Sequence, residues 1–214
     1  MKIRMHVNFT KKLKQDEYPM KIYTRTGDSG STSLFSNERV VKNHPLIEAI
    51  GAVDEANSAI GLAIAFLPKE TMFELIHKEL ELIQHALFEV GAALATPRNC
   101  HEKRKLDETR FDHEAIELLE EWMDAMDAQL PPLKFFILPG GHPCGAALHL
   151  CRSIVRRAER LVVPLYEKET VTQAVLVYLN RLSDYLFVVS RFVNALLNQS
   201  ETKWQHHKKS EYEI

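Results

Sequence analysis

The run of residues at 151–160 carries the strongest indication of chemistry, with the order Cys-Arg-Ser-Ile-Val-Arg-Arg-Ala-Glu-Arg. In a helix, Arg152, Arg156 and Glu159 fall at i, i+4 and i+7 and share one face. Arg157 lies about 100° around the helix from that face. Apolar residues between the arginines indicate that the helix is also packed. Guanidinium groups on a half-buried helix need anions, either protein carboxylates or a bound polyphosphate. A solvated basic face is the alternative.

A polar loop at 24–33, Thr-Arg-Thr-Gly-Asp-Ser-Gly-Ser-Thr-Ser, is a second candidate anion site. Glycine lets the backbone approach an anion, and successive N–H groups can surround it. The hydroxyl groups add donors, and Lys42 follows as a point charge suited to phosphate. The Walker A pattern G-x-x-x-x-G-K-[ST] is absent. A solvated turn between two elements is the alternative.

Polar residues also interrupt an apolar stretch at 178–184, Tyr-Leu-Asn-Arg-Leu-Ser-Asp, where Asn180 and Asp184 are i,i+4 neighbours. Buried polar groups need partners. These groups could pair with the arginine helix and specify its packing, or they could contact a nucleoside or its phosphates. Asp54, within another apolar stretch, would be a natural partner for a buried arginine, although alone it is typical of a solvated helix face.

The composition sets limits on the class of protein. The 214 residues are 45% hydrophobic and 26% charged, which suits one globular domain with a real core. A formal charge of -2 provides no overall positive field for nucleic acid or an anionic membrane. Three cysteines without a C-x-x-C pair predict a reduced, cytoplasmic protein. The absence of a membrane-length apolar run excludes a spanning helix.

Hydrophobic periodicity and prolines predict five long helices with no alternating strands, hence an all-α bundle. We expect Asp112 to cap the third helix and Pro164 to lie near the end of the fourth. Residues 97–110 should form a mobile loop, and Phe135–Leu138 an extended segment. The helices are expected at 45–67, 70–95, 112–129, 144–163 and 171–197. We expect a flexible extension at 1–20, with Met20 a candidate translation start, a single domain at 21–198 and a polar tail at 199–214.

Five segments together resemble the PduO-type ATP:cob(I)alamin adenosyltransferases, or corrinoid adenosyltransferases, in order and in approximate spacing. The resemblance runs from Lys21 to Arg191 and implies a five-helix bundle assembled as a homotrimer, with active sites between neighbouring subunits. The matching segments are IYTRTGDSGSTSLF (22–35), GAVDEANSAIGLA (51–63), FILPGG (136–141), CRSIVRRAER (151–160) and VYLNRLSDYLFVVSR (177–191).

The resemblance also implies roles for individual residues. Arg152 would pair with Asp54 across the subunit interface, and Arg181 and Asp184 would support the same polar network. Phe136 would pack beside the corrin and help to displace its lower axial base. The catalytic set would be Arg156, Arg152, Asp54 and Asp184; the ATP-binding set would be Thr24, Arg25, Thr26, Gly27, Thr32, Ser33, Lys42, Arg156, Arg157, Glu159, Arg160 and Asn180, with Mg²⁺ near Glu159.

The implied activity is transfer of the 5′-deoxyadenosyl group of ATP to cob(I)alamin, or a related corrinoid, with release of triphosphate. A cobalamin reductase and an adenosylcobalamin-dependent enzyme would be its protein partners. Two other interpretations stay open: a non-catalytic carrier of corrinoid or ATP, and a structural bundle with buried ion pairs.

Three places depart from the family pattern. Ser29 stands where a lysine is usual, which removes a positive charge and would weaken ATP binding. Ala56 replaces a common leucine, which we interpret as a change in packing. At 142–145, His142 or Cys144 could contact the corrinoid, but we favour a role in starting the following helix.

Overall fold

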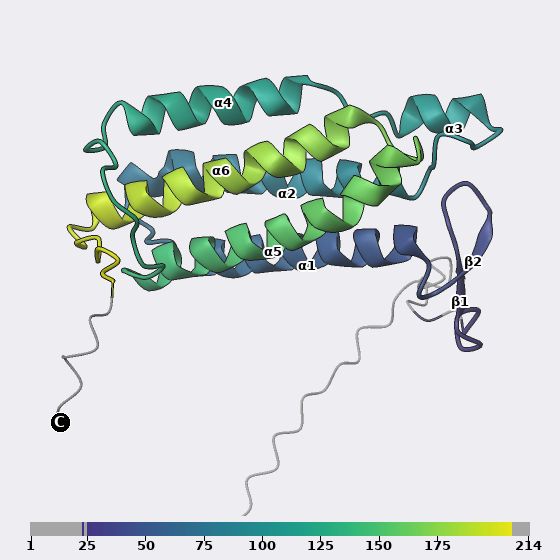
Figure 1. Cartoon of the computed structure of the whole chain (residues 1–214), viewed down its shortest axis with the longest axis horizontal. Coiled ribbons are helices and arrows are strands. Elements are labelled where there is room, and N and C mark those ends of the chain that lie inside the picture. The colour runs from purple at the N-terminus through teal and green to yellow at the C-terminus, as the bar shows by residue number, and fades with distance from the viewer. Residues whose placement is uncertain (1–22, 24, 207–214) are drawn as a thin grey trace, which may run out of the picture.

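Five long helices form a bundle in the computed structural model, which describes residue 23 and residues 25–206 (Figure 1). The predicted helical bundle is confirmed. Within the described residues, no helix has the length and apolar character needed to cross a membrane. The long helices are α1 (Pro45–Ala65), α2 (Glu74–Leu94), α4 (Glu114–Asp127), α5 (Pro143–Glu167) and α6 (Gln173–Leu196).

Helix α5 packs against both α1 and α6. Helix α2 packs on α1, and α4 packs on α6 (Figure 1). The core side of α5 is apolar, with Leu148, Val155 and Val162 fully buried. Burial of each such side chain contributes about 1.5–3 kcal/mol. The packed side of α5 therefore sets the orientation of its arginines.

Histidine and proline start two of the helices that carry predicted site residues, α1 and α5. His44 Nδ1 accepts a hydrogen bond from Leu46 N at 3.2 Å, and Pro45 opens α1. His142 Nδ1 accepts from Cys144 N at 3.2 Å, and Pro143 opens α5. Proline suits the first turn because its missing N–H has no intrahelical partner there. The helix-start role predicted for His142 is confirmed.

Two predicted helix ends were wrong. Helix α4 begins at Glu114 with His113 in the N-cap position, whereas Asp112 pairs with Arg110 at 3.1 Å. Asp112 is therefore held by a neighbouring guanidinium and does not cap the helix. Helix α5 ends at Glu167, beyond the predicted end at 163, although Pro164 does lie near the helix end as expected. Pro164 has no N–H to donate to the carbonyl of residue 160, so the helix continues with that one bond missing.

The segment at 97–110, predicted as a loop, contains the short helix α3 (Lys103–Glu108). Arg98 N donates to Thr170 O at 2.9 Å, and Asn37 Nδ2 donates to Glu102 Oε1 at 3.3 Å. A single 3₁₀ turn, η1 (Thr71–Phe73), precedes α2. The expectation of an irregular loop was wrong because contacts with distant parts of the chain order this charged segment.

The polar loop before α1 belongs to an antiparallel hairpin of β1 (Ser31–Ser33) and β2 (Arg39–Val41). Ser31 pairs with Val41, Thr32 with Val40 and Ser33 with Arg39. Asn37 takes a positive φ of 68° in the connecting turn, a conformation that asparagine tolerates better than most residues. The prediction of a chain without strands missed this hairpin, because each strand has only three residues.

His149 is a buried histidine between α5 and α6, with Nε2 at 3.1 Å from Ser190 Oγ. The Ser190 hydroxyl donates to Phe187 O at 2.7 Å, so its oxygen is free to accept from His149 Nε2–H. Burial, together with the positive charge of Arg152, lowers the pKa of His149 to about 4. The folded protein therefore holds a neutral imidazole.

We predict that acid destabilises the protein partly through His149. The unfolded chain binds a proton below about pH 6.5, whereas the folded imidazole resists protonation until about pH 4. The free energy of unfolding should therefore fall between these values, by up to about 3 kcal/mol. His149→Leu should flatten this part of the profile. Urea unfolding at a series of pH values checks it, and an unchanged slope would contradict the assignment.

Candidate functional site

The loop before β1 is closed by Arg39, a residue that the sequence analysis did not single out. Arg39 Nη2 donates to Thr26 O at 2.7 Å and to Ser31 Oγ at 2.7 Å. Gly30 N donates to Gly27 O at 3.1 Å, and Gly30 has a φ of 79°. One guanidinium thus ties the two sides of the loop together. Thr24 lies outside the described residues.

Lys42 lies against the same loop, immediately after β2. Its backbone N donates to Gly30 O at 2.9 Å. A methyl group added to Gly27 would meet Lys42 Cε and Nζ at 3.3 Å, so the lysine side chain crosses directly over this glycine. The structure therefore brings Gly27 and Lys42 together, as the sequence predicted. An anion approaching this backbone would meet the ammonium group.

The other predicted loop residues lie in or beside the hairpin. Arg25 has a positive φ of 61°, and its guanidinium lies 5.6 Å from the centre of the Tyr23 ring. Thr32 and Ser33 belong to β1. Thr26 takes part in the loop through the carbonyl that Arg39 contacts. These residues share one polar end of the molecule, next to the start of α1 (Figure 1).

The outer face of α5 combines arginines with one carboxylate. Asn180 Nδ2 on α6 donates to Glu159 Oε1 at 2.8 Å, so the amide holds this carboxylate in place. Arg160 Nη1 donates to Arg156 O at 3.2 Å. The guanidinium of Arg156 is exposed and has no protein partner in the described part of the chain. This face offers a free guanidinium, which can bind phosphate oxygens in pairs, beside a carboxylate that Asn180 holds.

Arg157, unlike Arg156, forms an ion pair with Glu55 of α1. Both side chains are about half exposed, so this pair contributes little to stability. Glu55 was missed by the sequence analysis, although it stands next to Asp54 in the same polar interruption of α1. The pair directs Arg157 toward α1.

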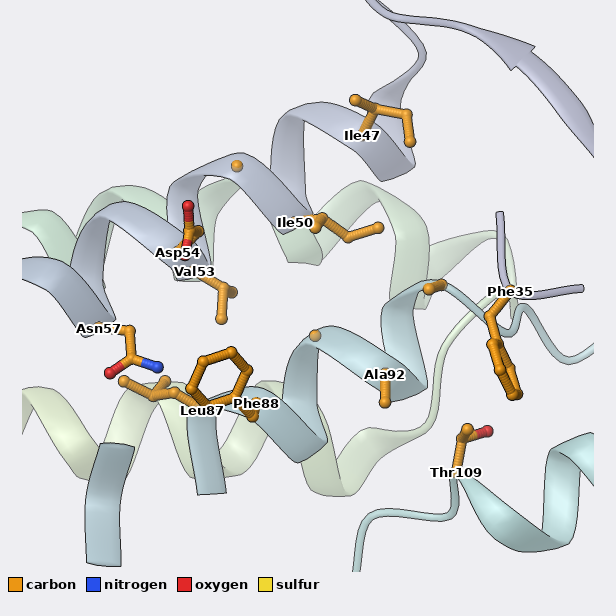
Figure 2. A pocket seen from close by; sticks show the side chains of 13 residues that line it. Phe35, Ile47, Ile50, Val53, Asp54, Asn57, Leu87, Phe88, Ala92 and Thr109 are labelled. Carbon is orange, nitrogen blue, oxygen red and sulfur yellow. The ribbon is translucent and has the colours of Figure 1, made fainter. Parts of the chain in front are cut away.

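Arg152 of α5 and Asp54 of α1 do not form the predicted pair within the described residues. Arg152 Nε is buried without a hydrogen-bond partner, which is unfavourable for a charged group. Asp54 projects from α1 at the edge of a groove between α1 and α2 (Figure 2). The described chain contains no ion pair between them. Neither charge has an ion-pair partner among the described residues of one copy.

The groove beside Asp54 was not predicted from the sequence. It has a volume of about 520 Å³ and is mainly apolar, with Phe88 prominent and 69% exposed (Figure 2). Asn57 donates to Gln84 O at 3.1 Å, but its own Oδ1 is buried without a partner. The lining of the groove includes Phe35, Ile47, Ile50, Val53, Leu87, Ala92 and Thr109.

Asp184 is held by the polar network between α6 and α4. Arg181 Nη1 lies 3.4 Å from Asp184 Oδ2, and Arg181 Nε donates to Glu120 Oε1 at 2.7 Å. Glu120 belongs to α4 and was missed by the sequence analysis. Within the residues that the structure describes, no ion pair joins Asp184 to an arginine of α5.

Phe136 projects from the connection between α4 and α5 and is 82% exposed. Its ring meets that of Trp204 edge to face, with centroids 6.5 Å apart. Trp204 N donates to Phe136 O at 2.8 Å, and Leu138 N donates to Thr202 O at 2.9 Å. The extended segment predicted at 135–138 therefore pairs with residues 202–204. Trp204 lies in the predicted polar tail and was missed as a partner.

A tight turn follows Phe136 and leads into α5. Gly141 has a φ of 96°, which favours glycine. A methyl group there would lie 2.4 Å from Asn194 Oδ1. Asn194 Oδ1 accepts from His142 N at 3.0 Å, and Asn194 Nδ2 donates to Gly140 O at 3.0 Å. The amide thus packs directly under the turn.

We predict that Gly141→Ala destabilises the protein by about 1–3 kcal/mol, through backbone strain and a clash with Asn194. Gly140→Ala is the matched control, because a methyl group there would have no neighbour within 4 Å. Urea unfolding of both variants measures the difference. Equal stability of the two would contradict the close packing of Asn194 beneath Gly141.

The sequence is similar to those of known proteins over most of its length. A family model described as cobalamin adenosyltransferase matches residues 22–193. The corrinoid adenosyltransferase MMAB of Mus musculus is 44% identical over 87% of this chain and 78% of its own length. The corrinoid adenosyltransferase of Bacillus subtilis is 47% identical over 82% of this chain and 88% of its own.

A solved structure shares the fold. It is a variant PduO-type ATP:corrinoid adenosyltransferase from Lactobacillus reuteri, complexed with cobalamin and ATP. The TM-score is 0.80 and the sequence identity is 38%, with 87% of this chain and 100% of that chain covered. The likeness therefore extends over nearly the whole bundle described above.

Proposed function

This chain belongs to the cobalamin adenosyltransferase family, and we propose that the arginine face of α5 and the loop before β1 hold the triphosphate of its substrate ATP. The protein is a corrinoid adenosyltransferase, which transfers the 5′-deoxyadenosyl group of ATP to a corrinoid and forms adenosylcobalamin. The observation that carries the proposed site is the exposed guanidinium of Arg156 beside Glu159, which Asn180 fixes.

The reaction needs no nucleophile from the protein. The cobalt(I) electron pair attacks the 5′ carbon of ATP, a Co–C bond forms and the C–O bond breaks. The bonding pair leaves with the oxygen, so triphosphate departs whole and cobalt becomes cobalt(III). The protein must hold the reacting atoms in line, which can lower the barrier by about 7–11 kcal/mol in favourable cases. It must also stabilise negative charge on the leaving group.

The proposed triphosphate site combines two cationic elements. Lys42 crosses Gly27 in the loop, while Arg156 and Arg160 stand on the outer face of α5. Guanidinium groups bind phosphate oxygens in pairs, and backbone N–H groups of a glycine loop add short contacts. Arg25, Thr26, Thr32 and Ser33 share the hairpin end of the molecule with Lys42, which supports their assignment to ATP.

Mg²⁺ fits this site as a companion of ATP. The described chain has no group of three or more metal-ligating side chains, so the protein alone offers no complete cage. Mg²⁺ commonly takes one or two carboxylates together with substrate phosphates and water. Glu159, oriented by Asn180 at 2.8 Å, is the carboxylate that would hold the ion. When bound, Mg²⁺ would neutralise charge that develops on the triphosphate.

The active unit is proposed to be a homotrimer with sites between neighbouring copies. Arg152 has a buried Nε without a partner, and Asp54 lies beside an exposed apolar groove. A neighbouring copy seated on that groove would cover Phe88 and supply Arg152 to Asp54. One contact would thus satisfy both charges. Asp184 would support the site at a distance, through Arg181.

Phe136 is the proposed contact for the corrin. A phenyl ring that is 82% exposed offers a flat apolar surface on which a corrin could pack. Against the lower side of the corrin, it would exclude both water and the axial base. Removing the lower ligand eases reduction to cobalt(I). Phe136 would then favour the nucleophile that attacks ATP.

The biological setting follows from the chemistry. Cobalt(I) requires an electron donor, so a cobalamin reductase would supply the substrate and an adenosylcobalamin-dependent enzyme would consume the product. Cys144 and Cys151 are buried as free thiols, and burial raises the pKa of both to about 12. Unpaired cysteines support a reducing compartment, the cytoplasm. In delivering adenosylcobalamin to the consuming enzyme, the protein would hold the product at the same site.

We predict that Arg156→Lys lowers kcat/KM by roughly 10- to 100-fold, because a point charge cannot reproduce the paired donors of a guanidinium. An anaerobic assay with chemically reduced cob(I)alamin, ATP and Mg²⁺ measures the change. Arg104→Lys is the matched control, since Arg104 is an exposed α3 residue paired with Glu108. Near-normal turnover of the Arg156 variant would remove this residue from the site.

Asp54 and Arg152 should show coupled effects across the subunit interface. We predict that Asp54→Ala and Arg152→Ala each weaken the trimer and lower activity, and that the double variant is little worse than either. A double-mutant cycle with sedimentation analysis tests this, with a coupling of about 1–3 kcal/mol expected. Additive losses would argue against the pair, and a wild type that sediments as a monomer would exclude the proposed trimer.

A further inference from the structure

Arg191 is a buried arginine in the last part of α6 that takes no part in the proposed triphosphate site. Its side chain is 3% exposed, and Nε donates to Glu201 Oε1 at 2.6 Å. Nη2 donates to Pro131 O at 3.0 Å, and Nη1 lies 3.9 Å from Asp127 Oδ1. One guanidinium therefore joins the start of the α4–α5 connection to the segment after α6.

Asn194 stands one turn further along α6 and holds the other end of the same connection. Its amide accepts from His142 N and donates to Gly140 O, both at 3.0 Å. Gly141 and Gly145 have no side chains, and this allows the amide to lie against their backbone. Arg191 and Asn194 are thus two fixed points, at the two ends of the connection that carries Phe136.

The segment after α6 adds a third fixed point. Glu201, held by Arg191, immediately precedes Thr202, whose carbonyl accepts from Leu138 N at 2.9 Å. Trp204 N then donates to Phe136 O at 2.8 Å, and its ring meets the Phe136 ring. The backbone on both sides of Ile137 is paired with this segment. Because Phe136 is mostly exposed, these contacts determine where its ring lies.

We propose that Arg191, Glu201 and Asn194 are positioning residues for the corrinoid wall formed by Phe136. The inference rests on the proposed role of Phe136, and it adds that the segment at 201–204 sets the position of that ring. A buried ion pair is rarely more stabilising than apolar residues of similar size, but it fixes direction and distance. A displacement of 1 Å in a reacting assembly can cost about 100-fold in rate.

Glu201→Ala releases the segment from Arg191 and tests the proposal. With cob(II)alamin that is reduced while bound, we expect KM for the corrinoid to rise about tenfold, because a misplaced wall leaves the lower base attached, with KM for ATP within about twofold of wild type. Glu201→Gln keeps an oxygen that can accept from Arg191 and should restore most of the loss. Asp127→Ala is the matched control, because Asp127 approaches the same guanidinium at 3.9 Å without holding the segment.

A second readout separates positioning from stability. Cob(II)alamin bound with ATP has an absorption and paramagnetic resonance spectrum that reports whether the lower axial base is attached. Glu201→Ala should retain the base in a larger fraction of the bound cob(II)alamin. Cobinamide carries no such base, so the variant should turn it over nearly as fast as wild type. A merely structural role would lower both activities together and leave the spectrum unchanged, which would overturn the proposal.

Two further variants keep the outcome decisive. Arg191→Met with Glu201→Leu removes both charges and preserves packing, so it tests positioning in a stable fold if Glu201→Ala unfolds. Wild-type corrinoid kinetics and a wild-type spectrum in that variant would contradict the inference. Phe136→Ala tests the premise, because unchanged activity in that variant would contradict the proposed role of Phe136. If Phe136→Ala impairs the enzyme, adding Glu201→Ala should cause little extra loss, whereas additive losses would show that Glu201 acts elsewhere.

Discussion

Guanidinium groups on a packed helix must meet anions, and α5 is a packed helix with four arginines between residues 152 and 160. Its apolar side is buried between α1 and α6, so the arginines cannot turn away from the surface that they occupy. The chain itself satisfies Arg157 through Glu55. Arg152 keeps a buried Nε without a partner, and Arg156 is exposed. A neighbouring copy and a polyphosphate would supply the remaining negative charge.

The other elements of the proposed site lie at the two ends of the bundle (Figure 1). A short hairpin, closed by Arg39, holds Lys42 across the glycine backbone of its loop at one end. The connection into α5, at the other end, carries Phe136 just before a turn that Asn194 holds. The helix that bears the arginines therefore runs between these two elements.

The sequence predicted the long helices well, because apolar spacing and prolines are local signals. Two helix ends were misplaced although the contacts there are local: Asp112 met a cap preference but pairs with Arg110, and α5 continues to Glu167 through Pro164. The hairpin strands are too short to show alternation. The groove beside Asp54 and the pairing of Trp204 with Phe136 depend on residues far apart in the sequence.

The candidate site was predictable from the sequence only where its signals are local. Arginine spacing on one helix face is visible in the sequence, as is a glycine and hydroxyl loop. The carboxylates that pair with Arg157 and Arg181, which are Glu55 and Glu120, come from other helices and had no local signal.

The measurement that tests the central claim most directly is product analysis of a single anaerobic turnover with cob(I)alamin, ATP and Mg²⁺. The account predicts one adenosylcobalamin for each intact triphosphate released, and loss of both products when Arg156 is replaced by alanine. Tight binding of ATP and corrinoid without either product would contradict it and leave a carrier. Undiminished turnover without Arg156 would contradict the location of the site on α5.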